Sequence, residues 1–332
     1  NFPGTLSLYC QNFLPSAIES NLISIRTPSG SQETHLYGLP DQTTCVALFW
    51  NKIFFQQNDL ALQKAGCDST RAPRTWDEFI AYGKILSHPE TQQFAFGMRN
   101  TLWWYFPFFQ SFGATFLYRD KSQQWRCGLN QKAGLEALNF IRDLYAKEYT
   151  VDGKKVHIEG GAWQSGAINP DQGFINGLYA MIFSGPWNLK TFRDAGVSFG
   201  VSFIPTGPAG TSSTVGGTNL VVFRSCAYPE VAFEVLQYIT SPEFQKQWCE
   251  RLGQIPTRQG IELRYQDFPE MPLFYQQMQH TRTRPPIPRY DLVEQFFNPE
   301  IELVLKRIKS PQEALDSAVL KIDEHIISLL EK

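Results

Sequence analysis

Residues 179–192 read YAMIFSGPWNLKTF, and this stretch joins two kinds of secondary structure. An apolar run over 180–183 predicts a buried strand, which stops at Ser184-Gly185-Pro186, and a helix is expected to begin after Trp187. A large aromatic side chain at such a junction either fills the core or stands at the mouth of a site. Ligands of α/β proteins gather at strand ends near helix N-termini, so Trp187 is a candidate binding residue.

Strands alternate with helices on both sides of this stretch. Apolar segments predict strands over 5–10, 43–51, 94–100, 199–204 and 218–223, and helical spacing predicts helices over 52–66, 130–149, 229–241, 241–253 and from 310 onward. Capping residues support these helices: Thr75 with Glu78, Asn130, Ser241, and Ser310 with Glu313. Residues 205–217, PTGPAGTSSTVGG, have a linker-like composition. The alternation predicts an α/β fold with largely parallel sheets.

Composition excludes several classes of protein. The 332 residues suggest two domains or one large one, and the formal net charge of −2 gives no sign of a nucleic-acid partner. No apolar run approaches the ~18–20 residues of a membrane helix, and no signal segment is present in this chain. Aromatic residues reach 14%, which suits a core and also a cleft for a carbohydrate or a flat apolar ligand.

Catalytic and metal motifs are absent from the sequence. The six cysteines are too far apart for a C-x-x-C motif, and they are read either as buried thiols or as one or more disulfides. His157 and Glu159 are two residues apart, but no further ligand supports a metal site there. Neither G-x-S-x-G nor G-x-G-x-x-G occurs. The sequence therefore predicts no cofactor and no metal, although two glycosidase carboxylates brought together by the fold would leave no motif.

Other candidate binding residues lie at the ends of predicted elements. The tryptophans and the tyrosine that follow the 94–100 strand are Trp103, Trp104 and Tyr105, and Trp163 lies in a glycine-rich segment. Gly217 and Asn219 precede the 218–223 strand or begin it, and Arg258 ends the segment GQIPTR. Each lone aromatic could equally be core, but several in one class of position favour a cleft.

Several motifs in register resemble one protein family. They are ALFWNKIFFQQNDLALQKAGCDSTRAPRTWDEF, FINGLYAMIFSGPWNL, FGVSFIPTGPAGTSSTVGGTNLVVF, SPEFQKQWCERLGQIPTR, RPPIPRY and SPQEALDSA. From about Tyr37 to the C-terminus the chain resembles, in order, the extracellular solute-binding proteins (family 1, sugar type) of bacterial ABC importers. The resemblance implies a two-lobe, type II periplasmic-binding-protein-like α/β fold with mixed, mostly parallel sheets and hinge crossings.

The resemblance also implies a domain division. Lobe one is expected to comprise 1–46 and 219–258, without the strand–helix–strand–helix unit with which family members usually begin. Lobe two is expected to comprise 50–215 and 262–332. The crossings are expected near Cys45–Asn51, Val215–Leu220 and Arg258–Glu262.

The function that the resemblance implies is binding without catalysis. A sugar, glycoside or polyol would bind between the lobes and pass to the transmembrane permease subunits of an importer. Aromatic contacts are expected from Trp187, Trp103, Trp104, Tyr105 and Trp163, and polar contacts from Thr44, Gly217, Asn219 and Arg258. A monomer is expected, periplasmic or extracytoplasmic, with a lipid anchor as one means of retention at the membrane. The alternatives are a carbohydrate-active enzyme with an aromatic cleft and a scaffold that has lost its ligand.

Overall fold

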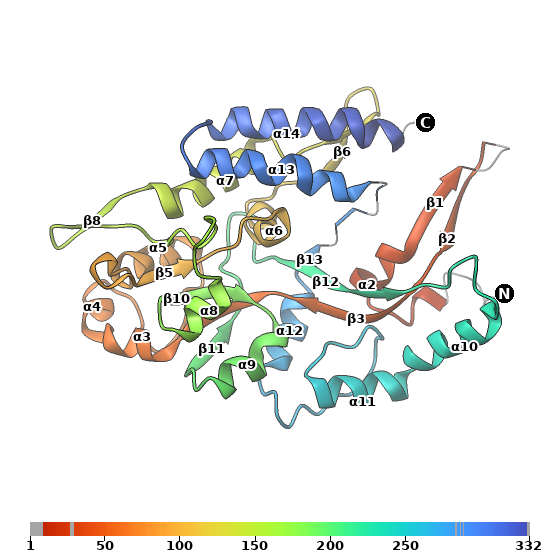
Figure 1. The fold of residues 1–332 in the computed structure, drawn as a ribbon, viewed down its shortest axis with the longest axis horizontal. Helices are drawn as coiled ribbons and strands as arrows, with labels where there is room; N and C mark the ends of the chain where they lie inside the picture. The colour runs from red at the N-terminus through yellow and green to blue at the C-terminus, as the bar shows by residue number, and fades with distance from the viewer. Residues whose placement is uncertain (1–8, 27–29, 283, 286, 288, 331–332) are drawn as a thin grey trace. The chain divides into compact units, whose positions relative to one another are not determined.

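The computed structural model describes residues 9–26, 30–282, 284–285, 287 and 289–330 (Figure 1). The chain divides into two compact units: unit 1 comprises Asn1–Cys45 and Val215–Pro286, and unit 2 comprises Val46–Thr214 and Ile287–Lys332. The chain therefore passes between the units at 45/46, 214/215 and 286/287. The first two crossings fall at the predicted segments.

The third crossing lies beyond the predicted segment near Arg258–Glu262, and this is a correction. Residues 262–286 belong to unit 1 because they pack on it. The Tyr265 hydroxyl donates to the carbonyl of Gln254 at 2.6 Å, and the Cys45 thiol donates to the carbonyl of Phe274 at 3.4 Å.

Unit 2 is built on a four-stranded sheet in the order β11-β4-β10-β5. The strands are β4 (Ala47–Asn51), β5 (Phe94–Gly97), β10 (Tyr179–Ser184) and β11 (Phe199–Ser202). Every residue of β4 and β10 is buried, as expected for strands covered on both faces. Short hairpins lie outside this sheet, formed by β6 (Leu117–Arg119) with β7 (Trp125–Cys127) and by β8 (Tyr149–Val151) with β9 (Lys154–Val156).

The direction of β4 makes this sheet mixed. β10 pairs with β5 in parallel, but β4 lies antiparallel to both β10 and β11. The sequence predicted mostly parallel pairing. Of the three strand pairs in this described sheet, only β10–β5 is parallel. The chain reaches β4 from unit 1 through the 45/46 crossing. β4 then lies between β10 and β11, which are consecutive strands joined by a helical connection.

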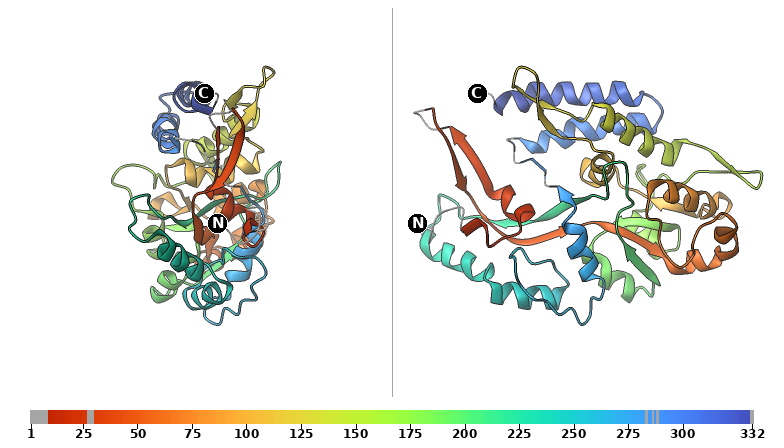
Figure 2. Two further views of the ribbon diagram at one scale, coloured as in Figure 1. Left: turned by 90° about the vertical axis from the view of Figure 1, so that its right-hand side faces the viewer. Right: turned by 180° about the vertical axis from the view of Figure 1, so that it is seen from behind.

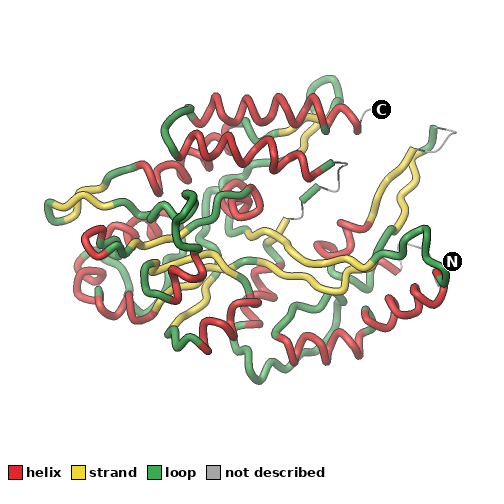
Figure 3. The backbone as a smooth tube through the Cα atoms, in the orientation of Figure 1, coloured by secondary structure: helices red, strands yellow, loops and turns green. Residues whose placement is uncertain are grey.

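Helices surround the sheet of unit 2 (Figure 3). They are α3 (Lys52–Gln57), α4 (Asp59–Lys64), α5 (Trp76–Ile85), α6 (Leu102–Ser111), α7 (Lys132–Ala146), α8 (Pro170–Ile175), α9 (Leu189–Asp194), α13 (Tyr290–Leu305) and α14 (Pro311–His325). The core between them is largely aromatic; Trp76, for example, stacks on Phe108 with ring centroids 4.9 Å apart. Aromatic pairs of this kind add to the free energy of burial.

The helices α13 and α14 form an antiparallel pair that stays side by side in every view (Figures 1 and 2). The predicted capping box at the start of α14 is confirmed: Ser310 accepts from the amide of Glu313, whose carboxylate accepts from the amide of Ser310 at 3.0 Å. Between the helices lies the carboxylate of Glu300, which is buried and accepts from Lys309 at 2.6 Å and from Lys321 at 3.1 Å.

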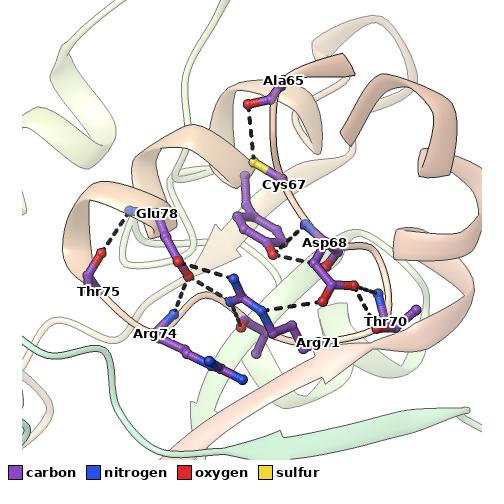
Figure 4. Close-up of polar contacts among 10 residues, drawn as sticks. Ala65, Cys67, Asp68, Thr70, Arg71, Arg74, Thr75 and Glu78 are labelled. Atoms are coloured by element: carbon purple, nitrogen blue, oxygen red, sulfur yellow. Dashed lines mark hydrogen bonds and ion pairs between the residues drawn. The ribbon is translucent and has the colours of Figure 1, made fainter. Parts of the chain in front are cut away.

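The box predicted at the start of α5 forms only in part (Figure 4). The Thr75 hydroxyl accepts from the amide of Glu78 at 3.1 Å. The Glu78 carboxylate, however, accepts from the Arg71 guanidinium at 2.7 and 3.1 Å and from the amide of Arg74 at 2.8 Å. A guanidinium offers two parallel charge-assisted hydrogen bonds, which together are stronger than the single hydrogen bond that the amide of Thr75 could donate. Glu78 therefore holds the preceding loop against α5.

Unit 1 contains a three-stranded sheet in the order β13-β12-β3 and a separate hairpin, β1–β2. Its elements are α2 (Pro15–Ile18), β1 (Leu22–Arg26), β2 (Gln32–Leu36), β3 (Leu39–Cys45), α10 (Pro229–Ile239), α11 (Pro242–Leu252), α12 (Met271–Met278) and β13 (Thr281–Arg282), with β12 (Ser213–Leu220) shared with unit 2 at its first residues. The predicted Ser241 cap of α11 is present. None of the residues of α10 is buried, and Val231, Val235 and Tyr238 are exposed on it.

Four local predictions differ from the structure. The strand predicted over 43–51 is two strands, β3 and β4, in different sheets. The linker-like stretch 205–217 supplies the start of β12, because its Val-Gly-Gly segment, residues 215–217, pairs with β3. Asn130 does not cap α7, since its side chain donates to Asp316 at 2.8 Å and Gln131 occupies the cap position. Residues 5–8 of the predicted first strand lie outside the described residues, while Tyr9 and Cys10 are helical.

All six cysteines are free thiols. Within the described ranges no helix is both long and apolar enough to cross a bilayer. The same ranges contain no group of three or more His, Cys, Asp or Glu residues that could hold a metal ion.

Candidate functional site

Three indoles meet at one end of the sheet of unit 2. Trp103 and Trp104 lie in the first turn of α6, and Trp187 lies in the single turn that follows β10. The Trp103 and Trp104 ring centroids are 4.6 Å apart, and each is 6.4 Å from the centroid of Trp187. We refer to Trp103, Trp104 and Trp187 as the tryptophan platform. Trp187 thus forms one aromatic surface with residues that lie 83 and 84 positions before it in the sequence.

The position of Trp187 depends on Gly185. A Cβ atom on Gly185 would lie 2.0 Å from Cζ3 and 2.3 Å from Cη2 of the Trp187 ring, far inside contact distance. The indole therefore lies directly over the glycine. Trp187 as a whole residue remains 40% exposed, so part of the platform is open to solvent. A glycine at the end of a buried strand allows this close approach of ring to backbone.

A polar network supports the platform. The Arg99 guanidinium lies 4.1 Å over the ring of Trp104 and forms an ion pair of 2.5 Å with Asp171. Ser184 donates to Asp171 at 3.3 Å, and Asn188 donates to Ser184 at 2.9 Å. Charged and amide groups thus flank the indoles, which is the combination that saccharide recognition uses.

Tyr105 and Trp163 are placed in the core of unit 2. Tyr105 is fully buried and its hydroxyl donates to Asn100 at 2.9 Å, while burial raises the pKa of Tyr105 well above its ordinary value. Trp163 is also buried and packs edge-on against Tyr145, with ring centroids 5.1 Å apart. In this structure neither ring belongs to the exposed surface of the platform.

Glu159 is a buried carboxylate that sequence reasoning considered only as a metal ligand. It accepts from the backbone amides of Gly161 at 2.6 Å, Ala162 at 2.9 Å and Met98 at 3.4 Å. Burial raises the pKa of Glu159 to about 7, although these amide hydrogen bonds oppose the rise. The carboxylate joins the end of β5 to the turn that carries Trp163.

Unit 1 contains a small polar pocket of about 90 Å³. Its lining comprises Ser16, Ala17, Ser20, Gln42, Thr43, Val215, Gly216, Gly217, Asn219 and Arg284. Asn219 accepts from the Asn21 side chain at 2.8 Å and donates to Ser20 at 3.1 Å, which fixes the orientation of its amide. Gly217 has φ of 147°, and a Cβ there would lie 2.3 Å from the carbonyl oxygen of Gln42. Only glycine therefore fits this part of the pocket wall.

The two other polar candidates of unit 1, Thr44 and Arg258, do not line this pocket. Thr44 is buried in β3, and among the described residues its hydroxyl has no hydrogen-bond partner. The Arg258 guanidinium lies 4.1 Å over the ring of Phe13 and donates from Nε to the carbonyl of Thr240 at 2.5 Å. Burial lowers the pKa of Arg258, although the Tyr9 hydroxyl beside it acts in the opposite direction. In this structure Arg258 thus joins Phe13, which precedes α2, to the C-terminal end of α10.

The family model of the bacterial extracellular solute-binding proteins matches residues 11–273. The chain belongs to this family. The solute-binding protein is 24% identical to the maltotriose-binding protein of Pyrococcus abyssi over 301 residues, covering 86% of this chain and 58% of the relative. It is 25% identical to the sn-glycerol-3-phosphate-binding periplasmic protein UgpB of Pectobacterium atrosepticum over 313 residues, covering 86% of this chain and 65% of the relative. It thus spans about three fifths of the length of these relatives.

Solved structures confirm the predicted fold of this solute-binding protein. The GacH receptor of Streptomyces glaucescens superimposes with a TM-score of 0.72 at 24% identity, covering 94% of this chain and 74% of that one. The substrate-binding protein Lmo0181 of Listeria monocytogenes gives a TM-score of 0.75 at 18% identity, covering 97% and 79%. The mixed α/β, two-lobe binding-protein fold is therefore shown.

Sequence reasoning missed the polar residues of both regions. Arg99 and Asp171 were not identified, and neither were Ser16, Ser20 and Arg284. A basic residue at a strand end four positions before two tryptophans could have indicated Arg99. The side chains that surround the pocket of unit 1 have no such local signal, because they come from four separate segments.

Proposed function

We propose that this solute-binding protein captures a neutral saccharide, glycoside or polyol outside the cytoplasmic membrane and delivers it to the permease subunits of an ABC importer. The observation that carries the proposal is the tryptophan platform, in which Trp187 is 40% exposed and its ring lies over Gly185. The C–H groups of a sugar face pack on indole rings, and its hydroxyls bond to neighbouring amides and carboxylates.

The charge around the platform favours a neutral ligand. The cation beside it, Arg99, is already paired with Asp171 at 2.5 Å and has only 17% of its side chain exposed. A phosphate ligand would gain its strongest hydrogen bonds from an unpaired guanidinium or ammonium group. The name of the Pyrococcus abyssi relative, maltotriose-binding protein, agrees with a neutral oligosaccharide, and we take it as the first ligand to test.

The experiment is calorimetric titration of the protein with maltotriose, other malto-oligosaccharides, simple glycosides and polyols, and with sn-glycerol 3-phosphate as a charged contrast. We expect binding of at least one neutral sugar. Replacement of Trp187 by alanine should cost ~1–3 kcal/mol of binding free energy, the range of a central aromatic contact. Trp248, 38% exposed on α11 of unit 1, provides the matched control, Trp248→Ala, with unchanged affinity.

The proposal excludes turnover of the bound sugar, which the rival enzyme reading requires. The sugar recovered after incubation should be chemically unchanged by chromatography. Cleaved or rearranged sugar would favour a carbohydrate-active enzyme, and an affinity that survives Trp187→Ala would remove the platform from the site. We further propose that the protein is a monomer, and sedimentation of the purified protein tests this oligomeric state. The monomer would be retained at the membrane by a lipid anchor or be free in the periplasm.

A further inference from the structure

We propose that Arg99 is the positioning residue of the tryptophan platform and sets ligand affinity through Trp104 and Trp187. This proposal rests on the proposed function, because it takes the tryptophan platform as the surface that binds the ligand. Arg99 itself lies two residues after the end of β5, with its guanidinium against the ring of Trp104. Its role follows from which elements it joins.

The side chain of Arg99 contacts three segments that are distant in sequence. Its guanidinium lies 4.1 Å over the Trp104 ring of α6, and it pairs with Asp171 in the first turn of α8 at 2.5 Å. Its Nη1 also donates to the carbonyl of Phe183 in β10 at 3.2 Å. One planar group therefore fixes α6, α8 and β10 relative to one another.

The bond to Phe183 occurs where the sheet leaves that carbonyl available. The β10–β5 ladder ends at the pair Ile182–Gly97. Beyond this pair, on the side of β5, the Arg99 guanidinium supplies the donor that a further strand residue would have supplied. Trp187 follows Phe183 by four residues. The hydrogen bond from Arg99 therefore fixes the end of β10, directly before the turn that carries Trp187.

The ion pair extends the support to the residue after Trp187. Asp171 accepts from the buried hydroxyl of Ser184, and Ser184 accepts from the side chain of Asn188 at 2.9 Å. A lysine cannot replace this arrangement, because an ammonium group neither stacks flat on an indole nor donates in two fixed directions. The geometry therefore requires arginine at position 99.

The experiment is a double-mutant cycle on ligand affinity with the tightest saccharide of the titration panel. Arg99→Gln should weaken binding about tenfold and Trp104→Ala about as much. The loss in the double variant should be smaller than the sum of the two, because Arg99 acts in part through Trp104. Arg99→Lys should recover only part of the loss. The control is Arg142→Gln on α7, whose arginine pairs with the adjacent Asp143 at 2.6 Å, and its affinity should be unchanged.

A ligand-free measurement keeps the proposal separate from the proposed function. In variants that far-UV circular dichroism shows to be folded, Arg99→Gln should reduce the near-UV signal of the coupled indoles and increase acrylamide quenching. Arg142→Gln should change neither. Additive losses in the cycle, or wild-type affinity of Arg99→Gln, would overturn the positioning role while leaving sugar binding intact. If no saccharide binds to the wild type, the proposed function fails, and unchanged spectra of Arg99→Gln would then overturn the positioning role independently.

Discussion

At the scale of single residues, a missing Cβ and a buried carboxylate have the clearest consequences. Gly185 has φ −128° and ψ −179°, an extended conformation open to any residue, so its backbone does not require glycine. The requirement comes from Trp187, whose ring occupies the space where a Cβ would lie. Glycine at position 185 therefore allows the Trp187 ring to lie against the backbone two residues before it.

We predict that Gly185→Ala displaces the Trp187 ring and weakens saccharide binding. The expected loss is ~1–3 kcal/mol, similar to that of Trp187→Ala, since both remove the same stacking contact. Titration calorimetry of both single variants and of the double variant measures it. In the Trp187→Ala background the alanine at 185 should have no further effect; an additional loss there would mean that Gly185 acts in another way.

The second residue-scale prediction concerns pH. Burial raises the pKa of Glu159 to about 7 in the folded protein, above the ordinary value of 4.5 in the unfolded chain. A carboxyl group with a raised folded pKa stabilises the fold below pH 4.5, and the stabilisation is lost as the pH rises to about 7. Relative to Glu159→Gln, the wild-type free energy of unfolding should fall by an amount on the order of 3 kcal/mol across this window.

Urea denaturation at closely spaced pH values measures this difference. Glu159→Gln is the suitable comparison because it removes titration and keeps the shape of the side chain. Parallel pH profiles for the two proteins would show that Glu159 is not buried in its neutral form.

At the scale of elements, the pair α13–α14 shows how a charge network can hold two helices together. Burial alone would raise the pKa of Glu300, but hydrogen bonds from Lys309, Ser317 and Lys321 lower it below its ordinary value. The carboxylate lies on α13, whereas Ser317 and Lys321 lie on α14. The network therefore spans the interface between the helices.

We predict that Glu300→Gln destabilises unit 2 by ~1–3 kcal/mol, because it leaves two ammonium groups without their shared carboxylate. The control is Glu302→Gln on the same helix, where the carboxylate forms an exposed pair with Lys306 and the change should be ~0.5 kcal/mol or less. Urea unfolding at pH 7 compares the two variants. Equal effects would show that the buried network contributes no more than a surface pair.

At the scale of the whole molecule, three short crossings join two units that each have their own packing. Packed interiors resist deformation, so a change in the relation of the units should concentrate at the crossings. We predict that the tightest saccharide lowers the radius of gyration, because a ligand favours the conformation to which it binds more tightly. Small-angle scattering with and without the sugar measures this change.

Variants in each unit test whether both contribute. Asn219→Ala in unit 1 and Trp187→Ala in unit 2 should each weaken binding of the same sugar and should each reduce the compaction at a fixed sugar concentration. Binding without compaction would contradict hinge closure. If Asn219→Ala leaves the affinity unchanged, Asn219 does not contact the ligand.

The sequence by itself determined the features that depend on neighbouring residues. The caps at Ser241 and Ser310 are read from three or four residues, and the position of Trp187 after a buried strand is a local pattern. The order of several motifs along the chain also indicated the family, because each motif marks one element of a shared fold.

Only the tertiary structure decided which distant residues meet. Arg99 pairs with Asp171 across 72 positions, Trp187 joins Trp103 and Trp104, and the opposite direction of β4 makes the sheet mixed. The same long-range packing directed Glu78 away from its expected cap, placed the Arg258 guanidinium over the ring of Phe13, and kept residues 262–286 in unit 1. Such contacts form between segments whose separation in sequence carries no periodic or capping signal, so burial and charge pairing in the folded chain select them.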